Sequence, residues 1–155
     1  YGEVGRNNSV YEGYNSRLDE VQAGLLSFGL TKLARLNKER NQLAKIYLNE
    51  LKGLPIKLPL SSSKKIKRVW HLFVIQTSKR DKLQQYLTKH NIQTGIHYPK
   101  PIHLQKCYNF LKLKNSDLPV VSKISKEILS LPLSPELTVK EIKYVCLKIR
   151  EFYEK

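Results

Sequence analysis

A proline-stiffened segment in the second half of the chain carries the densest set of side chains that could do chemistry. From Gly95 to Gln105 the sequence reads Gly-Ile-His-Tyr-Pro-Lys-Pro-Ile-His-Leu-Gln. Each proline fixes its own φ and biases the preceding residue toward an extended backbone, so the segment loses little conformational entropy when it binds a ligand. The pattern predicts that this segment forms a binding wall, that is, one side of a ligand-binding site. The alternative is a rigid surface turn whose histidines form only local hydrogen bonds.

A second segment, Gly-Tyr-Asn-Ser-Arg-Leu-Asp-Glu at residues 13–20, directly precedes a long helical pattern. A glycine, an amide and a hydroxyl at a helix N-terminus can hold an anion, because exposed backbone N–H groups and the positive end of the helix dipole point the same way. The simpler interpretation is that Ser16 only caps the helix.

Other catalytic patterns are not found in the sequence. It contains no Gly-x-Ser-x-Gly turn, Gly-rich phosphate loop or His-Glu-x-x-His helix. The four histidines lack the three- or four-residue spacing that helical metal ligands favour, so no metal site is predicted. We expect His71 to be a satisfied residue of a strand and His90 to interact with a helix C-terminus. His97 and His103 remain as candidates for ligand binding.

Length and composition predict one packed domain. The chain has 155 residues, and 41% of them are hydrophobic. Two cysteines, Cys107 and Cys146, are too few to indicate a disulfide framework. The sequence shows neither a signal peptide nor an apolar run long enough to span a membrane. A reduced, cytoplasmic setting is therefore expected. The first residue is Tyr1 and the opening residues are polar, which suggests that the sequence begins partway through a larger protein.

The net charge of +15 makes nucleic acid the first partner to consider. The basic residues are spread along the chain, however, and the densest run, residues 64–68, follows three serines and is expected to be a solvated loop. A non-enzymatic basic module that binds nucleic acid stays open as an alternative function.

Hydrophobic periodicity predicts one long amphipathic helix from Arg17 to about Leu51. Ser16 would cap it, acidic residues at 19 and 20 would complement its dipole, and Gly53 and Pro55 would end it. A helix of this length exceeds the needs of a small domain, which suggests that it reaches another domain or subunit.

The rest of the chain alternates strand-like and helix-like patterns. Strands are expected at 69–77, 93–97 and 129–133, and helices at 79–90 with Ser78 as cap, at 102–113, at 120–128 and from the cap Thr138 to the C-terminus. The expected fold class is α/β, an α+β small domain in which the long helix is followed by a sheet of about three strands packed against helices. The expected divisions are an irregular segment at 1–16, the long helix at 17–54 and the small domain at 55–155.

Four motifs in this order carry a family resemblance. They are Gly-Tyr-Asn-Ser-Arg-Leu-Asp-Glu before the long helix, Trp-His-Leu-Phe-Val at 70–74, Thr-Gly-Ile-His-Tyr-Pro-x-Pro-x-His at 94–103 and Leu-Ser-Leu-Pro-Leu at 129–133. Together they resemble the C-terminal part of sugar-nucleotide aminotransferases of the DegT/StrS type, and the resemblance spans essentially the whole chain.

The resemblance implies the C-terminal small domain of a fold-type I aminotransferase, similar to aspartate aminotransferase, with pyridoxal phosphate as cofactor. Such enzymes are homodimers that pass an amino group, usually from glutamate, to a nucleotide-linked keto sugar for surface polysaccharide or lipopolysaccharide synthesis. The Schiff-base lysine lies upstream in the family, so no catalytic residue is predicted in this chain and the chain alone is expected to be inactive. A dehydratase relative with histidine in place of that lysine, or a remnant that only dimerises, stays open.

The resemblance also implies roles for individual residues. Asn15 resembles the asparagine that reaches the cofactor phosphate of the partner subunit, with Tyr14 and Arg17 as neighbouring candidates. The segment at 95–103 resembles the wall that approaches the sugar nucleotide. The residues implied there to orient sugar or diphosphate groups are His97, Tyr98, Lys100 and His103.

Overall fold

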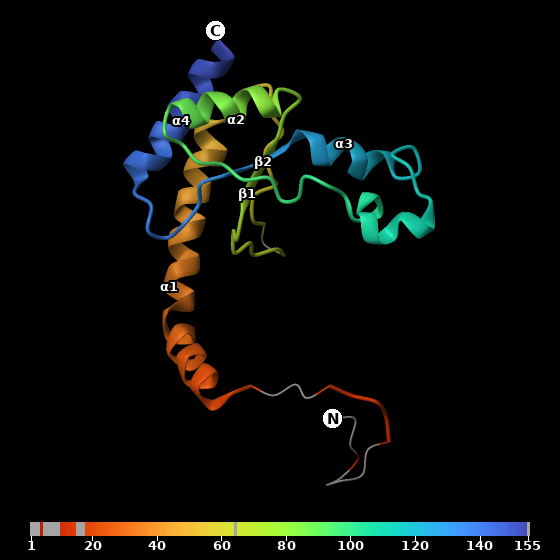
Figure 1. Cartoon of the computed structure of the whole chain (residues 1–155). Coiled ribbons are helices and arrows are strands. Elements are labelled where there is room, and N and C mark those ends of the chain that lie inside the picture. The colour runs from red at the N-terminus through yellow and green to blue at the C-terminus, as the bar shows by residue number, and fades with distance from the viewer. Residues whose placement is uncertain (1–3, 5–9, 15–17, 64, 155) are drawn as a thin grey trace. The chain divides into compact units, whose positions relative to one another are not determined.

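The computed structural model describes residues 4, 10–14, 18–63 and 65–154 (Figure 1). The chain divides into two compact units, Tyr1–Arg35 and Leu36–Lys155, and each is considered by itself. This division falls inside the long helix, and the boundaries expected at 16/17 and 54/55 stay predictions. In chain order the helices and strands are α1 (Glu20–Glu50), β1 (Phe73–Gln76), α2 (Arg80–Lys89), the 3₁₀ helices η1 (Ile102–Leu104) and η2 (Lys106–Leu111), α3 (Pro119–Glu127), β2 (Ile128–Leu131) and α4 (Val139–Glu154).

Helix α1 begins at Glu20, three residues later than its apolar pattern predicts. The Ala23 N–H donates to the Asp19 carbonyl at 2.8 Å, so Asp19 closes the first turn. Glu20 lies in that turn as expected, where its carboxylate complements the helix dipole. The expected cap, Ser16, lies outside the described residues. At the other end the helix stops just before Gly53, whose φ of +86° is readily reached only by glycine.

The two halves of α1 have different surroundings in their own units. In the first half the apolar residues predicted to form its stripe are exposed, for example Val21, Leu25 and Phe28. In the second half Leu43, Ala44 and Tyr47 are buried. The Tyr47 ring lies 4.7 Å from the ring of Phe73 in β1, so this half of the helix is part of the domain core.

The sheet of the described residues has two antiparallel strands rather than about three. β1 pairs with β2 in a register that places Val74 opposite Ser130. The segment expected as a strand at 93–97 contributes one isolated bridge, between Gly95 and Ser130. Beyond that segment a ladder cannot continue, because Pro99 and Pro101 have no N–H to donate.

Strand β1 is shorter than the apolar run at 69–77 predicts, because Trp70 has a left-handed backbone with φ of 53°. This conformation interrupts the extended chain before Phe73. It directs the Trp70 ring onto Phe73, 5.4 Å between centroids, and lets the indole N–H donate to the Asn41 side chain at 3.0 Å. His71 is consequently exposed and precedes the strand, which corrects its expected place within one.

Helices α2 and α4 pack on each other, and α2 also contacts β2. The expected cap of α2, Ser78, is wrong: the N-cap position is Lys79 and no side chain caps the helix. The Thr77 hydroxyl accepts from the Lys79 N–H at 3.1 Å and so shapes the turn that leads into α2. The expected cap of α4 is confirmed: the Thr138 hydroxyl accepts from the Glu141 N–H at 3.3 Å, and the Glu141 carboxylate accepts from the Thr138 N–H at 2.7 Å. The buried apolar residues of the core come mainly from α1, β1, α2, β2 and α4, and include Ile75, Leu83, Leu87, Leu129, Ile142, Val145, Cys146 and Ile149. Leu51, directly after α1, is also part of the core.

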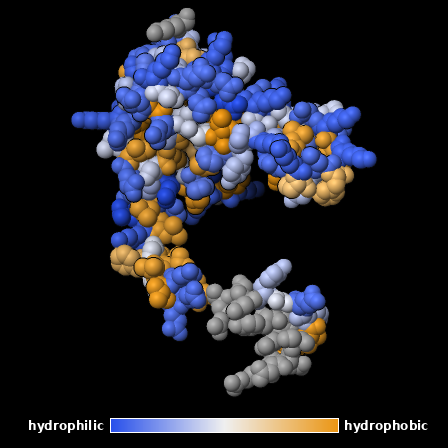
Figure 2. All heavy atoms as spheres, in the orientation of Figure 1, coloured by the Kyte–Doolittle hydropathy of each residue, from blue (hydrophilic) through white to orange (hydrophobic). Residues whose placement is uncertain are grey.

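The segment from η1 to α3 forms a lobe at one end of the sheet (Figure 1). The single helix expected at 102–113 is replaced by two short 3₁₀ helices, because Gln105 between them is extended, with φ of −67° and ψ of 142°. Lys112, with φ of 52°, ends the second one. Apolar atoms lie on the surface of this lobe among hydrophilic ones (Figure 2), and the exposed apolar side chains include Ile102, Phe110 and Val120.

Candidate functional site

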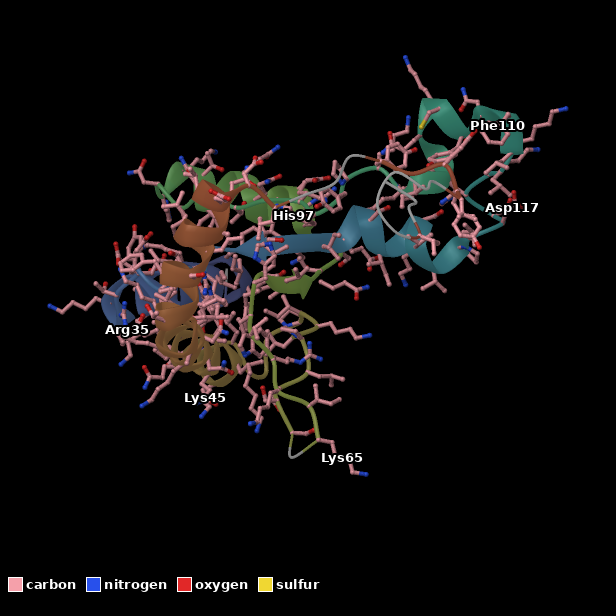
Figure 3. All side chains as sticks on the ribbon, turned by 90° about the horizontal axis from the view of Figure 1, so that it is seen from below. Arg35, Lys45, Lys65, His97, Phe110 and Asp117 are labelled. Atoms are coloured by element: carbon pink, nitrogen blue, oxygen red, sulfur yellow. The ribbon has the colours of Figure 1, made fainter. Side chains whose placement is uncertain are left out.

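His97 is held by a contact from the neighbouring strand. Its Nδ1 atom lies 2.9 Å from the hydroxyl oxygen of Ser130 in β2. Figure 3 shows His97 beside the sheet, away from Phe110 and Asp117 at the outer end of the lobe. His97 as a whole is exposed, so part of its side chain is open to solvent while Nδ1 contacts the protein.

The Ser130 main chain is fully engaged at the same place. Its N–H donates to the Gly95 carbonyl at 2.7 Å, and its carbonyl accepts from the Gly95 N–H at 3.0 Å. Both backbone groups of Ser130 are therefore satisfied by Gly95, and the hydroxyl is the group left for His97. The Ser130 side chain is only 4% exposed, which makes this a built contact and not a surface encounter.

Gly95 provides the space for the imidazole. A Cβ atom built at Gly95 would lie 2.7 Å from Cε1 of His97, closer than side-chain carbons approach other atoms. The ring therefore lies directly against the glycine, and any larger residue would displace it. Gly95, His97 and Ser130 form one unit, which we call the histidine clamp.

Tyr98 and Lys100 are exposed next to the clamp. The Tyr98 side chain is 75% exposed, and its ring meets the His97 ring edge-on with 5.7 Å between centroids. The peptide bond that joins them is cis. The Lys100 carbonyl accepts from the Gln105 side-chain amide at 3.1 Å, while the Lys100 side chain is exposed. An imidazole, a phenol and an ammonium on one exposed segment can bind an oxygen-rich anion.

His103 has different surroundings from the other predicted substrate contacts. It lies in η1 and is 8% exposed, with Nε2 3.4 Å from the hydroxyl of Ser122 in α3. The Ser125 hydroxyl in turn donates to the Ser122 carbonyl at 3.2 Å. The imidazole of His103 thus connects η1 to α3, and its burial does not favour direct contact with a ligand.

The residues predicted to contact a cofactor phosphate belong to the other compact unit. Tyr14 is exposed, whereas Asn15 and Arg17 lie outside the described residues. A Schiff-base cofactor needs a lysine in desolvated surroundings. The described lysines are exposed except Lys148, which is half-buried and ion-paired with Glu151 at 2.9 Å. The described part of the chain therefore offers no lysine that fits pyridoxal phosphate, and we assign no step of cofactor chemistry to it.

Two residues of the clamp were not predicted from the sequence as site residues. Ser130 is a polar residue inside the apolar run Ile-Leu-Ser-Leu, and its buried hydroxyl needs a hydrogen-bond partner. That requirement was a usable signal, but it names no partner. Gly95 lies two residues before His97, so that in an extended chain both face the same side. No residue pattern indicates that Ser130 lies beside them.

Among the described residues, no group of three or more His, Cys, Asp or Glu side chains could hold a metal ion. None of the described helices is both long enough and apolar enough to cross a membrane.

The fold is that of a small α/β domain that follows a long helix in the sequence, as in fold-type I aminotransferases. Residues 2–150 match the model of the DegT/DnrJ/EryC1/StrS aminotransferase family, and the chain belongs to this family. The structure aligns with the crystal structure of DesV from S. venezuelae in complex with a ketimine intermediate, with a TM-score of 0.92 and 37% identity. That alignment covers 100% of this chain and 42% of DesV.

Curated relatives agree with this assignment. The chain is 38% identical over 152 residues to the dTDP-3-amino-3,6-dideoxy-alpha-D-galactopyranose transaminase of Aneurinibacillus thermoaerophilus, covering 98% of this chain and 41% of the relative. It is 37% identical over 156 residues to the dTDP-3-amino-3,4,6-trideoxy-alpha-D-glucose transaminase of Streptomyces venezuelae, covering 100% and 41%. The chain thus spans about two fifths of the length of the curated relatives it matches.

Proposed function

We propose that this chain is the C-terminal part of a pyridoxal-phosphate-dependent aminotransferase that moves an amino group, from glutamate, to a nucleotide-linked keto sugar. The observation that carries the proposal is the match of residues 2–150 to the aminotransferase family model. Two relatives that are transaminases of dTDP-linked sugars support the substrate class. The pathway would be cytoplasmic synthesis of an amino sugar for surface polysaccharide or lipopolysaccharide.

The exposed segment beside the histidine clamp is proposed to face the sugar nucleotide. His97 and Tyr98 would orient sugar or diphosphate oxygens by hydrogen bonds, and Lys100 would attract the diphosphate charge. His103 was predicted to act in the same way. Its contact with Ser122 supports a different role, in which it holds η1 on α3 and so fixes the segment that carries the exposed groups.

Asn15 is proposed to contact the cofactor phosphate of the partner subunit. Tyr14 and Arg17 are neighbouring candidates for the same contact. When bound, pyridoxal phosphate supplies the electron sink for the reaction, and the lysine that holds it would come from another part of the protein. The role left to this chain is binding and orientation.

A homodimer is proposed as the working form. Apolar side chains on the first half of α1 support it: Val21 is 77% exposed, Leu25 69% and Phe28 63%. Side chains of this kind in one helix favour coverage by further polypeptide. Mass measured against concentration tests this, and a mass that stays monomeric for the longer protein would contradict it.

The test of the function uses the longer protein that contains this chain. We expect the visible absorbance of a lysine-bound cofactor, its loss when that lysine is replaced, and amino transfer from glutamate to a nucleotide-linked keto sugar. The 155-residue chain alone should show neither property. If this chain alone binds the cofactor covalently and transaminates, the proposal is wrong. If the longer protein has histidine at the Schiff-base position, the dehydratase relative is correct.

A further inference from the structure

We propose that Ser130 is a positioning residue whose hydroxyl donates a hydrogen bond to Nδ1 of His97. The neutral imidazole then carries its proton on Nε2 and presents an N–H donor to a ligand. That this donor meets an oxygen of the substrate rests on the proposed function. The tautomer itself follows from the geometry of the histidine clamp.

The first step concerns the hydroxyl of Ser130. Its oxygen lies 2.9 Å from Nδ1 of His97, a good hydrogen-bond distance. Either atom could supply the proton, because the distance alone does not define the tautomer. The side chain is 4% exposed and lies in β2, between the buried side chains of Leu129 and Leu131 along the strand.

The second step decides which atom donates. A buried hydroxyl has one proton, and leaving that proton without an acceptor costs about 1–3 kcal/mol. Nδ1 of His97 lies within hydrogen-bond distance of this hydroxyl and can accept from it. If Nδ1 carried the proton instead, the Ser130 proton would be left buried without that acceptor. The arrangement in which Ser130 donates and Nδ1 accepts is therefore favoured.

The third step concerns the orientation of the ring. Gly95 lies under the imidazole, with the built Cβ position 2.7 Å from Cε1, and the Gly95 backbone is tied to Ser130 by two hydrogen bonds. The ring is thus held between a glycine and a serine whose own positions are fixed by the sheet. With Nδ1 occupied, Nε2–H is the ring's remaining polar group, and it selects an acceptor such as a sugar or phosphate oxygen.

The experiment measures the tautomer directly. In the ¹⁵N-labelled 155-residue chain, long-range ¹H–¹⁵N spectra of the neutral imidazole of His97 should show the proton on Nε2 and Nδ1 as a hydrogen-bonded acceptor. In Ser130→Ala the Nδ1 resonance should lose its hydrogen-bond shift and a population protonated on Nδ1 should appear. Ser130→Thr, which keeps a hydroxyl, should restore the wild-type pattern.

Ser125→Ala is the matched control, because Ser125 is also a buried serine but contacts the Ser122 carbonyl in α3 and not His97. It should leave the His97 resonances unchanged. A wild-type ring protonated on Nδ1 would overturn the proposal. So would His97 resonances that are identical in the wild type and in a folded Ser130→Ala variant. The wild-type spectrum decides the question even if Ser130→Ala does not fold.

A second arm separates this proposal from the proposed function. Inorganic pyrophosphate, a probe for a diphosphate, should shift the Nε2–H resonance and bind Ser130→Ala about fivefold more weakly, the loss expected for one hydrogen bond. An Nε2–H tautomer together with no pyrophosphate effect would contradict the substrate assignment and support the positioning role. An Nδ1–H tautomer together with pyrophosphate binding would contradict the positioning role and support the substrate assignment.

Discussion

The phenol of Tyr47 in α1 donates a hydrogen bond of 2.8 Å to the carbonyl of Pro132, which follows β2. The two residues are 85 positions apart, so this bond joins the long helix to the segment that leaves the sheet. The Tyr47 side chain is completely buried, and burial, followed by the negative charge of a Cys146 thiolate, raises the pKa of its phenol far above the usual value. The phenol therefore stays protonated and donates throughout the folded range of pH.

We predict that Tyr47→Phe lowers the free energy of unfolding by about 1 kcal/mol, because the bond is lost while the ring packing is kept. Urea denaturation measures this. Tyr144→Phe is the control: its hydroxyl reaches the His90 carbonyl only at 3.5 Å and its side chain is 44% exposed. The control should change stability by less than about 0.5 kcal/mol. Equal losses in the two variants would contradict the role given to Tyr47.

We predict that Gly95→Ala displaces the His97 ring, because the new Cβ would lie 2.7 Å from Cε1. The His97 side-chain resonances should shift and the Ser130 contact should be lost, at a cost of about 1 kcal/mol. Gly29→Ala is a matched control, since a Cβ at that helical position meets nothing within 4 Å. It should leave His97 unchanged and stabilise the chain by up to about 1 kcal/mol. An unmoved ring in Gly95→Ala would refute the steric argument.

The hydrogen bonds to Glu151 in α4, one of which comes from Tyr86 in α2, predict that the free energy of unfolding depends on pH. The Lys148 ammonium, at 2.9 Å, and the Tyr86 hydroxyl, at 3.0 Å, both donate to Glu151, and these hydrogen bonds hold the pKa of that carboxyl below its ordinary value near 4.5. A pKa that is lower in the folded state stabilises the fold above the unfolded pKa, and this contribution is lost as the pH falls through the folded pKa.

We therefore expect stability to decline below about pH 4.5 and the decline to be shallower in Glu151→Gln, which keeps an acceptor but has no charge to protonate. Thermal unfolding between pH 3 and pH 7 measures it. Glu154→Gln, an exposed residue at the end of the same helix, is the control and should follow the wild type. A wild-type slope in Glu151→Gln would exclude this network as a source of the acid sensitivity.

The two free cysteines should react at different rates. Cys107 in η2 is exposed, whereas Cys146 in α4 is 2% exposed, and burial together with the Glu50 carboxylate raises the pKa of its thiol to about 12. Because the thiolate is the nucleophile, one thiol per chain should react quickly and the second only on unfolding. A disulfide-exchange reagent counts them. In Cys107→Ser the rapid phase should vanish, and a rapid phase that persists would show that Cys146 is accessible.

Several elements of the fold were predictable because they depend on local pattern. The apolar periodicity of α1, the Thr138 cap of α4 and the apolar run around Leu129 each express a preference of neighbouring residues. Helix α1 still begins at Glu20, and β1 still begins at Phe73, because the bounds of an element depend on single backbone conformations such as the positive φ of Trp70.

The candidate site shows the same division. By itself the sequence determined that two prolines restrict the backbone after His97, it predicted a ligand-binding segment there, and its ordered motifs indicated the aminotransferase family. Only the tertiary structure decided that His97 meets Ser130 while His103 turns into the contact with Ser122. The physical reason is sequence separation: Ser130 follows His97 by 33 residues, and only the pairing of β2 with Gly95 brings the two side chains together.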